Sequence, residues 1–410
     1  MRLSLATTAL LILRTFALPS ENRGSEQTER VAYPQSGALD VFNPPPKLFH
    51  LWDYTANDGQ CVRDLERAHA VAERMQSHYW NSSTGYYNTG NLWGDANTYE
   101  TLLNLMLASG SSEYTETMLT SLTMKAGADP GTDWVQFIAG SNDDAGWIIL
   151  ALIKMSDYLD ARGEEGGAQF LNSAIKVCNI IGREWDDTCG GGLWWSTAHT
   201  YKNAITNELF FMASGTLYLR TGQEVFLENA KLTWTWLLNS GMRNAEGLWN
   251  DGLTDTCENN GQETWSYNQV VVASGLSLLY AITGDESYLT EAEISLDATI
   301  SLKTENGILR ESCDDVAGST VCDNNQVIFK GIWTKHVQFY LDNVKDDART
   351  AKYSAFLGAQ SSGVFHYGTN GSNDVGTCWY APDEGGSTFG VLSTSSGMAA
   401  HVASAKYGGC

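Results

Sequence analysis

Two kinds of helical segment alternate along most of this sequence, and this alternation limits the folds that the chain can adopt. The segments 145–158, 203–219 and 268–282 are apolar on nearly every side, so other helices must enclose each of them. The segment 61–79 instead carries charged residues along one side only. Counting in this way predicts enclosed helices that begin near residues 96, 144, 203, 268, 325 and 388, and amphipathic helices that begin near residues 61, 112, 168, 224, 286 and 346.

An internal repeat supports this count and predicts how the helices connect. Residues 221–230 match residues 283–292 at Thr, Gly, Glu, an aromatic residue, Leu and Ala, and a looser copy occupies 169–174. Glycine can end an enclosed helix there, and a short turn then leads to an antiparallel outer helix. Six such hairpins closed into a ring form an all-α (α/α)6 barrel with six inner and six outer helices. An open superhelical array is the alternative, but only the closed ring has one central cleft.

Charge and composition restrict the partners that the chain can bind. The chain has 410 residues, of which 43% are hydrophobic, so it can bury a large core. It contains 48 acidic and 25 basic residues, and its formal net charge is -23. Such a surface repels the phosphates of nucleic acids and anionic lipid headgroups, whereas a neutral polysaccharide meets no such repulsion. We therefore expect no nucleic acid and no membrane surface as partners, whereas a neutral polymer is compatible with this charge.

Several features predict a secreted, extracellular protein. Residues 1–20 resemble a secretory signal peptide, because a charged start is followed by the apolar run 3–13. Residues 21–50 are polar and contain three consecutive prolines, which is typical of a leader or linker. Sequons for N-glycosylation at Asn81 and Asn370 fit the same route. We expect a monomer with a single catalytic domain at 51–410 and, because the sequence ends without an apolar tail, no membrane anchor.

Eight cysteines in a secreted chain indicate disulfides rather than a metal site. Cys178 and Cys189 are close in sequence, as are Cys313 and Cys322, so we predict that each pair forms a local disulfide. The other four cysteines have no obvious local partner. The sequence contains no CxxC and no HExxH motif, so we expect neither a metal ion nor another cofactor.

Two adjacent carboxylates, Asp143 and Asp144, stand at the start of one enclosed helix. Asn and Asp are common as helix N-caps, and capping is the alternative interpretation. The functional interpretation is a glycosidase pair, in which one carboxylate attacks the anomeric carbon and the other protonates the leaving oxygen. The helix N-terminus stabilises the ionised carboxylate. Burial and a neighbouring negative charge raise the pKa of its partner, which suits an acid.

Aromatic and amide residues recur where other inner helices begin. Trp194 and Trp195 follow three glycines and offer flat faces to sugar rings, although such a pattern is more often a glycine loop followed by a pair of core tryptophans. Such clusters at one end of a barrel are typical of a cleft for a neutral polymer, where aromatic faces stack on sugars and amides bind hydroxyls. Further clusters of this kind lie at 93–97, 249–253 and 265–269.

In this order, these motifs resemble glycoside hydrolase family 76, which contains the endo-α-1,6-mannanases and their fungal cell-wall relatives. The resemblance extends from about Cys61 to at least Trp333, and its motifs lie at 142–147, 189–195, 201–204, 207–210, 250–252, 265–269 and 329–331. It implies an (α/α)6 barrel, an α-1,6-mannan substrate, Asp143 as nucleophile and Asp144 as acid/base. It also implies a cleft lined by Trp93, Asn97, Trp194, Asn203, Asp251, Tyr267 and Asn268. Gly146 before a single Trp147 departs from the two aromatic residues that the family commonly has there.

The resemblance covers two activities, hydrolysis and, in some fungal cell-surface relatives, the transglycosylation of GPI-linked mannan at the cell wall. Hydrolysis is the expected activity, because Glu208 looks more like the hydrolase branch and because the chain has no apolar tail for a lipid anchor. A glycan-binding barrel without activity and a polysaccharide lyase are the remaining alternatives. A lyase acting on uronic acids would need basic residues near its carboxylates, whereas the candidate residues here are acidic and aromatic.

Overall fold

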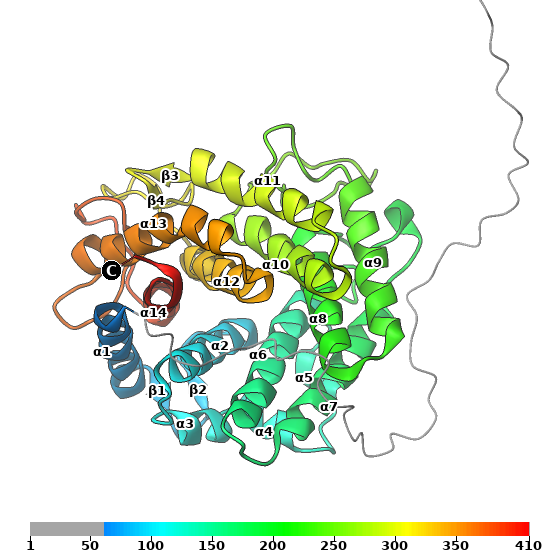
Figure 1. The fold of residues 1–410 in the computed structure, drawn as a ribbon, viewed down its shortest axis with the longest axis horizontal. Coiled ribbons are helices and arrows are strands. Elements are labelled where there is room, and N and C mark those ends of the chain that lie inside the picture. The colour runs from blue at the N-terminus through cyan, green and yellow to red at the C-terminus, as the bar shows by residue number, and fades with distance from the viewer. Residues whose placement is uncertain (1–60, 410) are drawn as a thin grey trace, which may run out of the picture.

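The protein folds as an (α/α)6 barrel, which confirms the fold predicted from the sequence (Figure 1). The computed structural model describes residues 61–409, so the predicted signal peptide at 1–20 and leader at 21–50 lie outside the described residues. In the described chain the inner ring consists of α2 (Leu92–Ser109), α6 (Asn142–Ala161), α8 (Ala204–Thr221), α10 (Ser266–Thr283), α12 (Phe329–Val344) and α14 (Val391–Tyr407). The outer ring consists of α1 (Val62–His78), the short α3 (Thr115–Thr120) and α4 (Leu122–Ala128), α7 (Gly167–Gly182), α9 (Glu224–Asn239), α11 (Ser287–Leu302) and α13 (Asp347–Gly363).

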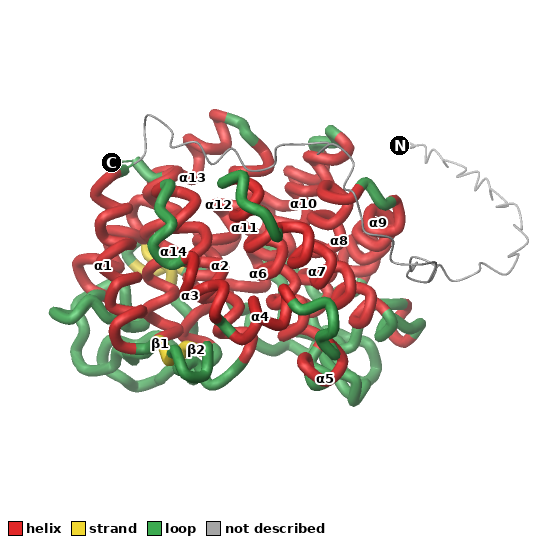
Figure 2. The backbone as a smooth tube through the Cα atoms, turned by 90° about the horizontal axis from the view of Figure 1, so that it is seen from below, coloured by secondary structure: helices red, strands yellow, loops and turns green. Residues whose placement is uncertain are grey.

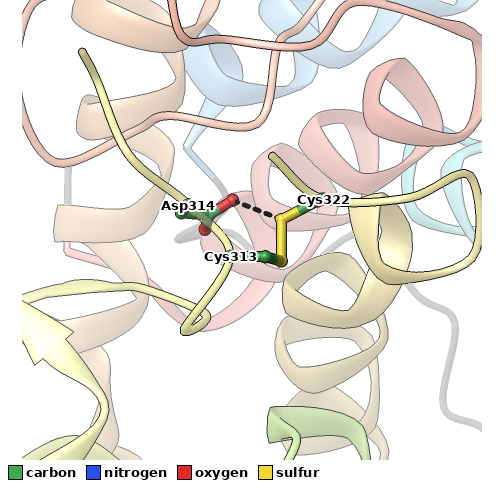
Figure 3. Close-up of side chains that lie close together, drawn as sticks. All are labelled: Cys313, Asp314 and Cys322. Atoms are coloured by element: carbon green, nitrogen blue, oxygen red, sulfur yellow. Dashed lines mark hydrogen bonds between the residues drawn. A yellow bond between two sulfur atoms is a disulfide. The ribbon is translucent and has the colours of Figure 1, made fainter. Parts of the chain in front are cut away.

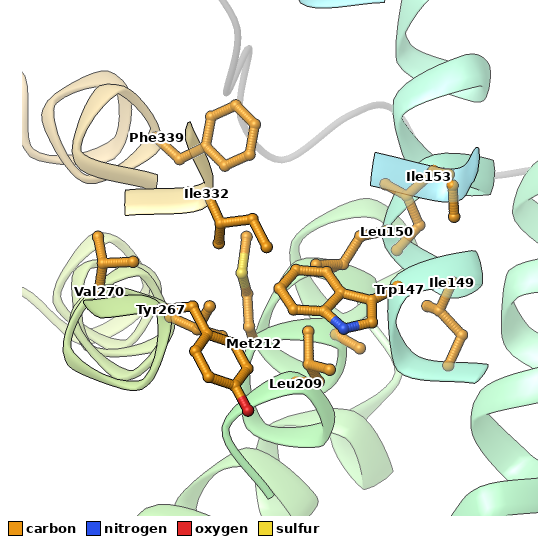
Figure 4. Packing of buried hydrophobic residues seen from close by; sticks show 14 of the residues in the cluster. Trp147, Ile149, Leu150, Ile153, Leu209, Met212, Tyr267, Val270, Ile332 and Phe339 are labelled. Carbon is orange, nitrogen blue, oxygen red and sulfur yellow. The ribbon is translucent and has the colours of Figure 1, made fainter. Parts of the chain in front are cut away.

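Burial separates the two rings, as the apolar patterns predict. In α14 every residue from Val391 to Ala405 is buried, whereas α13 buries only a few of its side chains. The ring closes because α14 packs against both α12 and α2. Figure 4 shows how side chains of α6, α8, α10 and α12 meet at the centre, with Trp147 opposite Tyr267 and Met212 between them. Side chains from the inner helices therefore pack against one another at the centre of the barrel.

The turns of the internal repeat have the predicted structure. Gly222 ends α8 and Gly284 ends α10, both in the left-handed conformation with φ of 66° and 74°. A residue with a side chain is strained there, which explains why the repeat keeps glycine. One prediction was less accurate: the outer helix expected near residue 112 is divided into α3 and α4. Ser121 between them is extended, and its side chain caps α4 by accepting a hydrogen bond from the amide of Met124.

The two ends of the barrel differ in the length of their loops. The longer loops gather at the end where the inner helices begin, together with α5 (Trp134–Ile138) and the hairpin of β1 (Trp80–Asn81) and β2 (Tyr86–Tyr87) (Figure 2). A second hairpin pairs β3 (Thr304–Glu305) with β4 (Ile308–Leu309). None of the helices within 61–409 is both long and apolar enough to cross a membrane.

One of the two predicted disulfides is confirmed and the other is wrong. Cys313 pairs with Cys322 as predicted. Cys189 pairs instead with Cys257, which is 68 residues away in sequence. Cys178 is a free cysteine that lies buried in α7, whereas Cys189 lies in a loop that the segment around Cys257 approaches. Proximity along the chain was misleading because it does not say which way a helical side chain points.

The contact between α12 and α14 yields a stability prediction. A Cβ on Gly331 would lie 2.3 Å from Ser396 Cα, so Gly331→Ala must push the two inner helices apart. We expect this overpacking to lower the free energy of unfolding by about 1–3 kcal/mol in urea denaturation. The matched control is Gly358→Ala in α13, where the nearest atom would be at 3.4 Å. Alanine favours a helix over glycine, so this control should be neutral or stabilising by up to about 1 kcal/mol. Equal effects of the two substitutions would contradict this account.

Candidate active site

A cleft of about 560 Å³ opens at the loop-rich end of the barrel. The starts of inner helices and the loops before them form its walls, as the sequence predicts for the candidate residues. Its lining combines carboxylates, amides, hydroxyls and aromatic rings, and contains no Lys, Arg or His: Asn91, Trp93, Ser141, Asp143, Asp144, Trp147, Trp195, Tyr201, Asn203, Asp251, Trp265, Tyr267, Asp323, Asn325, Gln326 and Phe329.

Hydrogen bonds to the loop that contains Trp194 and Trp195 position the start of α6. The amide of Asn142 donates to the carbonyl of Trp195 at 3.0 Å, and its side-chain Nδ2 donates to the carbonyl of Trp194 at 2.9 Å. Ser141 pairs with Ser196 in an isolated β-bridge. These bonds hold the first turn of α6, which includes Asp143 and Asp144, against the wall of the cleft.

Asp143 accepts hydrogen bonds on both carboxylate oxygens. Ser141 Oγ and the amide of Asp144 donate to Oδ1, each at 2.9 Å. Trp195 Nε1 donates to Oδ2 at 2.8 Å. Burial raises the pKa of Asp143, and these hydrogen bonds act in the opposite direction because they favour the charged form. The start of a helix adds a further favourable field for a negative charge.

Asp144 has a different environment although it is the next residue. Burial and the charge of Asp143 raise its pKa to about 7, and only a contact with Ser141 opposes them. Two carboxylates this close do not both ionise easily, so they share one proton near neutral pH. Asp143 receives more hydrogen bonds than Asp144, and these bonds favour its charged form. The pair therefore combines one carboxylate able to attack with one carboxyl group able to donate a proton.

A second acidic group lies at Asp251, in the loop between α9 and α10. Tyr201 donates to Asp251 Oδ2 at 2.6 Å and receives a hydrogen bond from Asn260. Burial raises the pKa of Asp251, while Tyr201 and Asn268 lower it. Glu208 lies deeper, in α8, and neither of its oxygens has a hydrogen-bond partner among the described residues. Burial and the charge of Asp251 raise the pKa of Glu208 well above its ordinary value.

Aromatic rings form much of the remaining surface. Tyr267 stacks on Phe329 with the ring centres 4.1 Å apart. The ring centres of Trp93 and Trp147 are 6.2 Å apart. Trp195 leaves 43% of its surface exposed at the rim. Flat apolar faces beside hydrogen-bonding groups suit the two faces and the hydroxyls of a sugar ring.

Seven of the ten site residues predicted from the sequence line the cleft, and three do not. Asn97 is buried behind Trp93 and accepts a hydrogen bond from Lys335. Trp194 turns away, because its Nε1 donates to Asp186 and its ring stacks on His199. Asn268 is buried beside Asp251. The seven that line the cleft are Trp93, Asp143, Asp144, Trp195, Asn203, Asp251 and Tyr267.

The sequence reasoning missed one wall of the cleft, which Asp323, Asn325 and Gln326 form just before α12. These residues belong to a run of polar residues directly before an enclosed helix, and this pattern could have indicated that they line the cleft. The disulfide Cys313–Cys322 ends at the residue before this wall (Figure 3).

By distance, one group of residues within 61–409 could hold a metal ion: Cys313, Asp314 and Cys322 (Figure 3). Both of its sulfur atoms belong to the disulfide, so neither is a thiolate. Asp314 is paired with Lys330. These three residues are therefore structural.

Comparison with known proteins agrees with this geometry. The model of glycosyl hydrolase family 76 matches residues 65–406. This chain belongs to glycosyl hydrolase family 76. Among curated relatives, the mannan endo-1,6-alpha-mannosidase DCW1 of Eremothecium gossypii is 23% identical over 339 residues, which cover 79% of this chain and 74% of the relative.

Solved structures share the fold of this family 76 protein. An α-1,6-mannanase from Salegentibacter sp., in complex with α-1,6-mannotriose, gives a TM-score of 0.70 at 20% identity and covers 84% of this chain and 99% of its own. That protein is an inactive variant in which two adjacent aspartates are replaced by asparagine. Dfg5 from Chaetomium thermophilum, in complex with glucosamine, gives a TM-score of 0.72 at 17% identity and covers 86% and 92% of the two chains.

The unequal pair yields a titration prediction. In the family 76 protein labelled with 13C at the Asp carboxyl carbon, Asp144 should titrate with a pKa of about 7 in NMR spectra. Asp143→Asn removes the neighbouring charge and should lower the pKa of Asp144. Asp251→Asn is the control, because it removes a cleft carboxylate that does not contribute to this shift. If Asp143→Asn left the pKa of Asp144 unchanged, the two carboxyl groups would not share a proton.

Proposed function

We propose that this protein is a retaining glycoside hydrolase that cleaves α-1,6-mannosidic linkages in mannan, with Asp143 as nucleophile and Asp144 as acid/base. The observation that carries the proposal is the unequal hydrogen bonding of two adjacent carboxylates in one cleft. Support for the substrate comes from the relatives, several of which are mannan endo-1,6-alpha-mannosidases, and from the mannotriose complex of a structural neighbour.

The proposed reaction has two steps. In the first, a carboxylate oxygen of Asp143 attacks the anomeric carbon, the bond to the leaving oxygen breaks, and Asp144 gives its proton to that oxygen. In the second, Asp144 takes a proton from water, the water oxygen attacks the anomeric carbon, and Asp143 leaves as a carboxylate. Adjacent residues are hard to separate by the roughly 6.5–9.5 Å that an inverting water needs, so the pair favours retention.

The charge of the cleft supports the same chemistry. Positive charge develops on the sugar ring in the transition state of glycoside cleavage. Asp143, Asp144, Asp251 and Asp323 line the cleft, and no cationic side chain does so within the described chain. Preorganised negative groups stabilise a developing positive charge where it forms. A neutral substrate also enters without repulsion from this acidic surface.

Release from the cell is part of the proposal. Asn81 ends strand β1 and is partly exposed, and Asn370 lies in an exposed loop, so both sequon asparagines are accessible for glycosylation. The net charge of -23 favours a soluble monomer in the medium. Expression with the native N-terminus and mapping of the secreted protein by mass spectrometry test this part, and retention of all the protein inside the cell would refute it.

Turnover should depend on both aspartates. We expect Asp143→Ala and Asp144→Ala each to lower the release of reducing sugar from linear α-1,6-mannan at least about 1,000-fold, since each removes a group that acts in both steps. The melting temperature of each variant should stay within a few degrees of that of the wild type. Near-normal activity in either variant would refute the role of that residue. Release of sugar from β-1,4-mannan but not from α-1,6-mannan would refute the substrate.

Products can separate the two roles and the two activities. With an aryl α-mannoside and azide, Asp144→Ala should give the α-mannosyl azide, because Asp143 still forms the intermediate. Asp143→Ala should give the β azide, because azide then attacks directly.

For the wild type, NMR should detect the α anomer as the first product. Early accumulation of oligomers longer than the substrate would mark a transglycosylase instead of a hydrolase.

A further inference from the structure

Trp195 contacts both the solvent at the rim of the cleft and the carboxylate of Asp143. Its ring lines the cleft and is 43% exposed. Its Nε1 donates to Asp143 Oδ2 at 2.8 Å. The same side chain therefore offers a face to a ligand and a hydrogen bond to the carboxylate.

The main chain fixes the orientation of this indole. The amide of Trp195 donates to the carbonyl of Tyr201 at 2.8 Å, and its carbonyl accepts from the amide of Asn142 at 3.0 Å. The edge of the ring meets Tyr201, with ring centres 6.4 Å apart and planes at 79°. Tyr201 in turn donates to Asp251. Trp195 thus connects the start of α6 with the loop on the Asp251 side of the cleft.

The two oxygens of Asp143 depend on different supports. The partners of Oδ1 are Ser141 and the amide of Asp144, both in the first turn of α6 or directly before it. The partner of Oδ2 is an indole at the rim, where water competes for the same N–H group. Because a hydrogen bond to a charged group strengthens when water is excluded, the Oδ2 bond, whose donor is the more exposed, should strengthen most when a ligand covers the rim.

We propose that Trp195 is a positioning residue that couples sugar binding to the reactivity of Asp143. A sugar ring packed on the exposed indole face excludes water from the bond between Nε1 and Oδ2. The strengthened bond then holds Asp143 ionised and oriented toward the anomeric carbon. This inference rests on the proposed function, in which Asp143 is the nucleophile.

The other groups that face Asp143 cannot replace this bond. They are Asp144 on α6, Tyr267 on α10, and the Asp251 and Tyr201 side chains on the neighbouring loops. The carboxylates among them oppose a charge on Asp143, and the cleft has no cation among the described residues. Hydrogen bonds and the field of the helix start offset the cost of burying the charge, and among the hydrogen bonds the one from Trp195 lowers the pKa of Asp143 most.

Trp195→Phe tests the inference, because it removes the N–H group and keeps an aromatic ring. We expect kcat on α-1,6-mannooligosaccharides to fall about 10- to 100-fold, with KM changed less than about threefold, since the lost bond involves a charged acceptor. Activity needs ionised Asp143 and is lost as the pH falls. Removal of the bond raises the pKa of Asp143, so the acid limb moves to higher pH. Trp195→Ala should raise KM as well, because the sugar platform is also lost.

The coupling is tested by comparing the pH profile of kcat with the pH profile of kcat/KM. The acid limb of kcat/KM reports the free enzyme and that of kcat reports the substrate complex. Relative to the wild type, Trp195→Phe should raise the apparent pKa of the kcat limb more than that of the kcat/KM limb. Ser141→Ala removes a bond to Oδ1 instead, from a less exposed donor, and should raise the two limbs by more nearly equal amounts. Equal shifts in Trp195→Phe would overturn the coupling, and no shift would overturn the positioning role.

A matched control and a measurement without substrate complete the test. Trp194→Phe removes an indole bond of 2.9 Å to Asp186 in the same loop, and whatever its effect on rate it should leave the acid-limb pKa values unchanged. In 13C NMR spectra of the free protein, the pKa of Asp143 should rise in Trp195→Phe but not in Trp194→Phe. If the wild type released no sugar from α-1,6-mannan, the proposed function would fail. An unchanged pKa of Asp143 in the NMR titration would refute the role of Trp195 by itself.

Discussion

The enclosure of six helices that have no polar face is the constraint on which the rest of this structure depends. Each inner helix must be covered on all sides, and a closed ring surrounded by a second ring satisfies all of them at once. The hairpin connections then place the starts of the inner helices at one end of the barrel. Since the first turn of a helix leaves amide groups unpaired, this end offers hydrogen-bond donors to carboxylates and ligands. The site lies here because the fold concentrates such donors at this end.

The cleft itself depends on loops, and covalent and polar links restrain them. Cys189–Cys257 joins the glycine-rich loop to the segment that follows Asp251, and Cys313–Cys322 ends beside the wall at Asp323. The glycine-rich loop contains residues 190–192. The buried ammonium group of Lys202 restrains this loop by donating to the carbonyls of Thr188 and Gly191, at 2.7 and 2.8 Å. With these restraints, carboxylates that repel one another keep fixed positions around the cleft.

The sequence predicted the fold well and the site in part, for identifiable physical reasons. Enclosed helices have a composition that outer helices lack, so their number and order could be read directly. The position of Asp143 and Asp144 at a helix start was also readable. Whether Asn97, Trp194 and Asn268 face the cleft depends on how each helix is rotated and on the path of each loop, and local sequence specifies neither. The predicted disulfide of Cys178 was wrong because the rotation of α7 was likewise unknown from the sequence. The bond from Trp195 to Asp143 spans 52 residues, and local patterns contain no information about such a contact.

Closure of the inner ring by α14 has a consequence for the order of events in folding. Ser404 Oγ donates to Asp64 Oδ2 at 2.6 Å, and the amide of Cys61 donates to the carbonyl of Ala405, so the first and last helices of the described chain meet. Contacts across 340 residues form slowly because a long loop must close first. During synthesis the apolar flanks of α2 and α12 stay uncovered until α14 leaves the ribosome. The nascent barrel is therefore open-sided, and chaperones that bind apolar surface have a target until the final helix arrives.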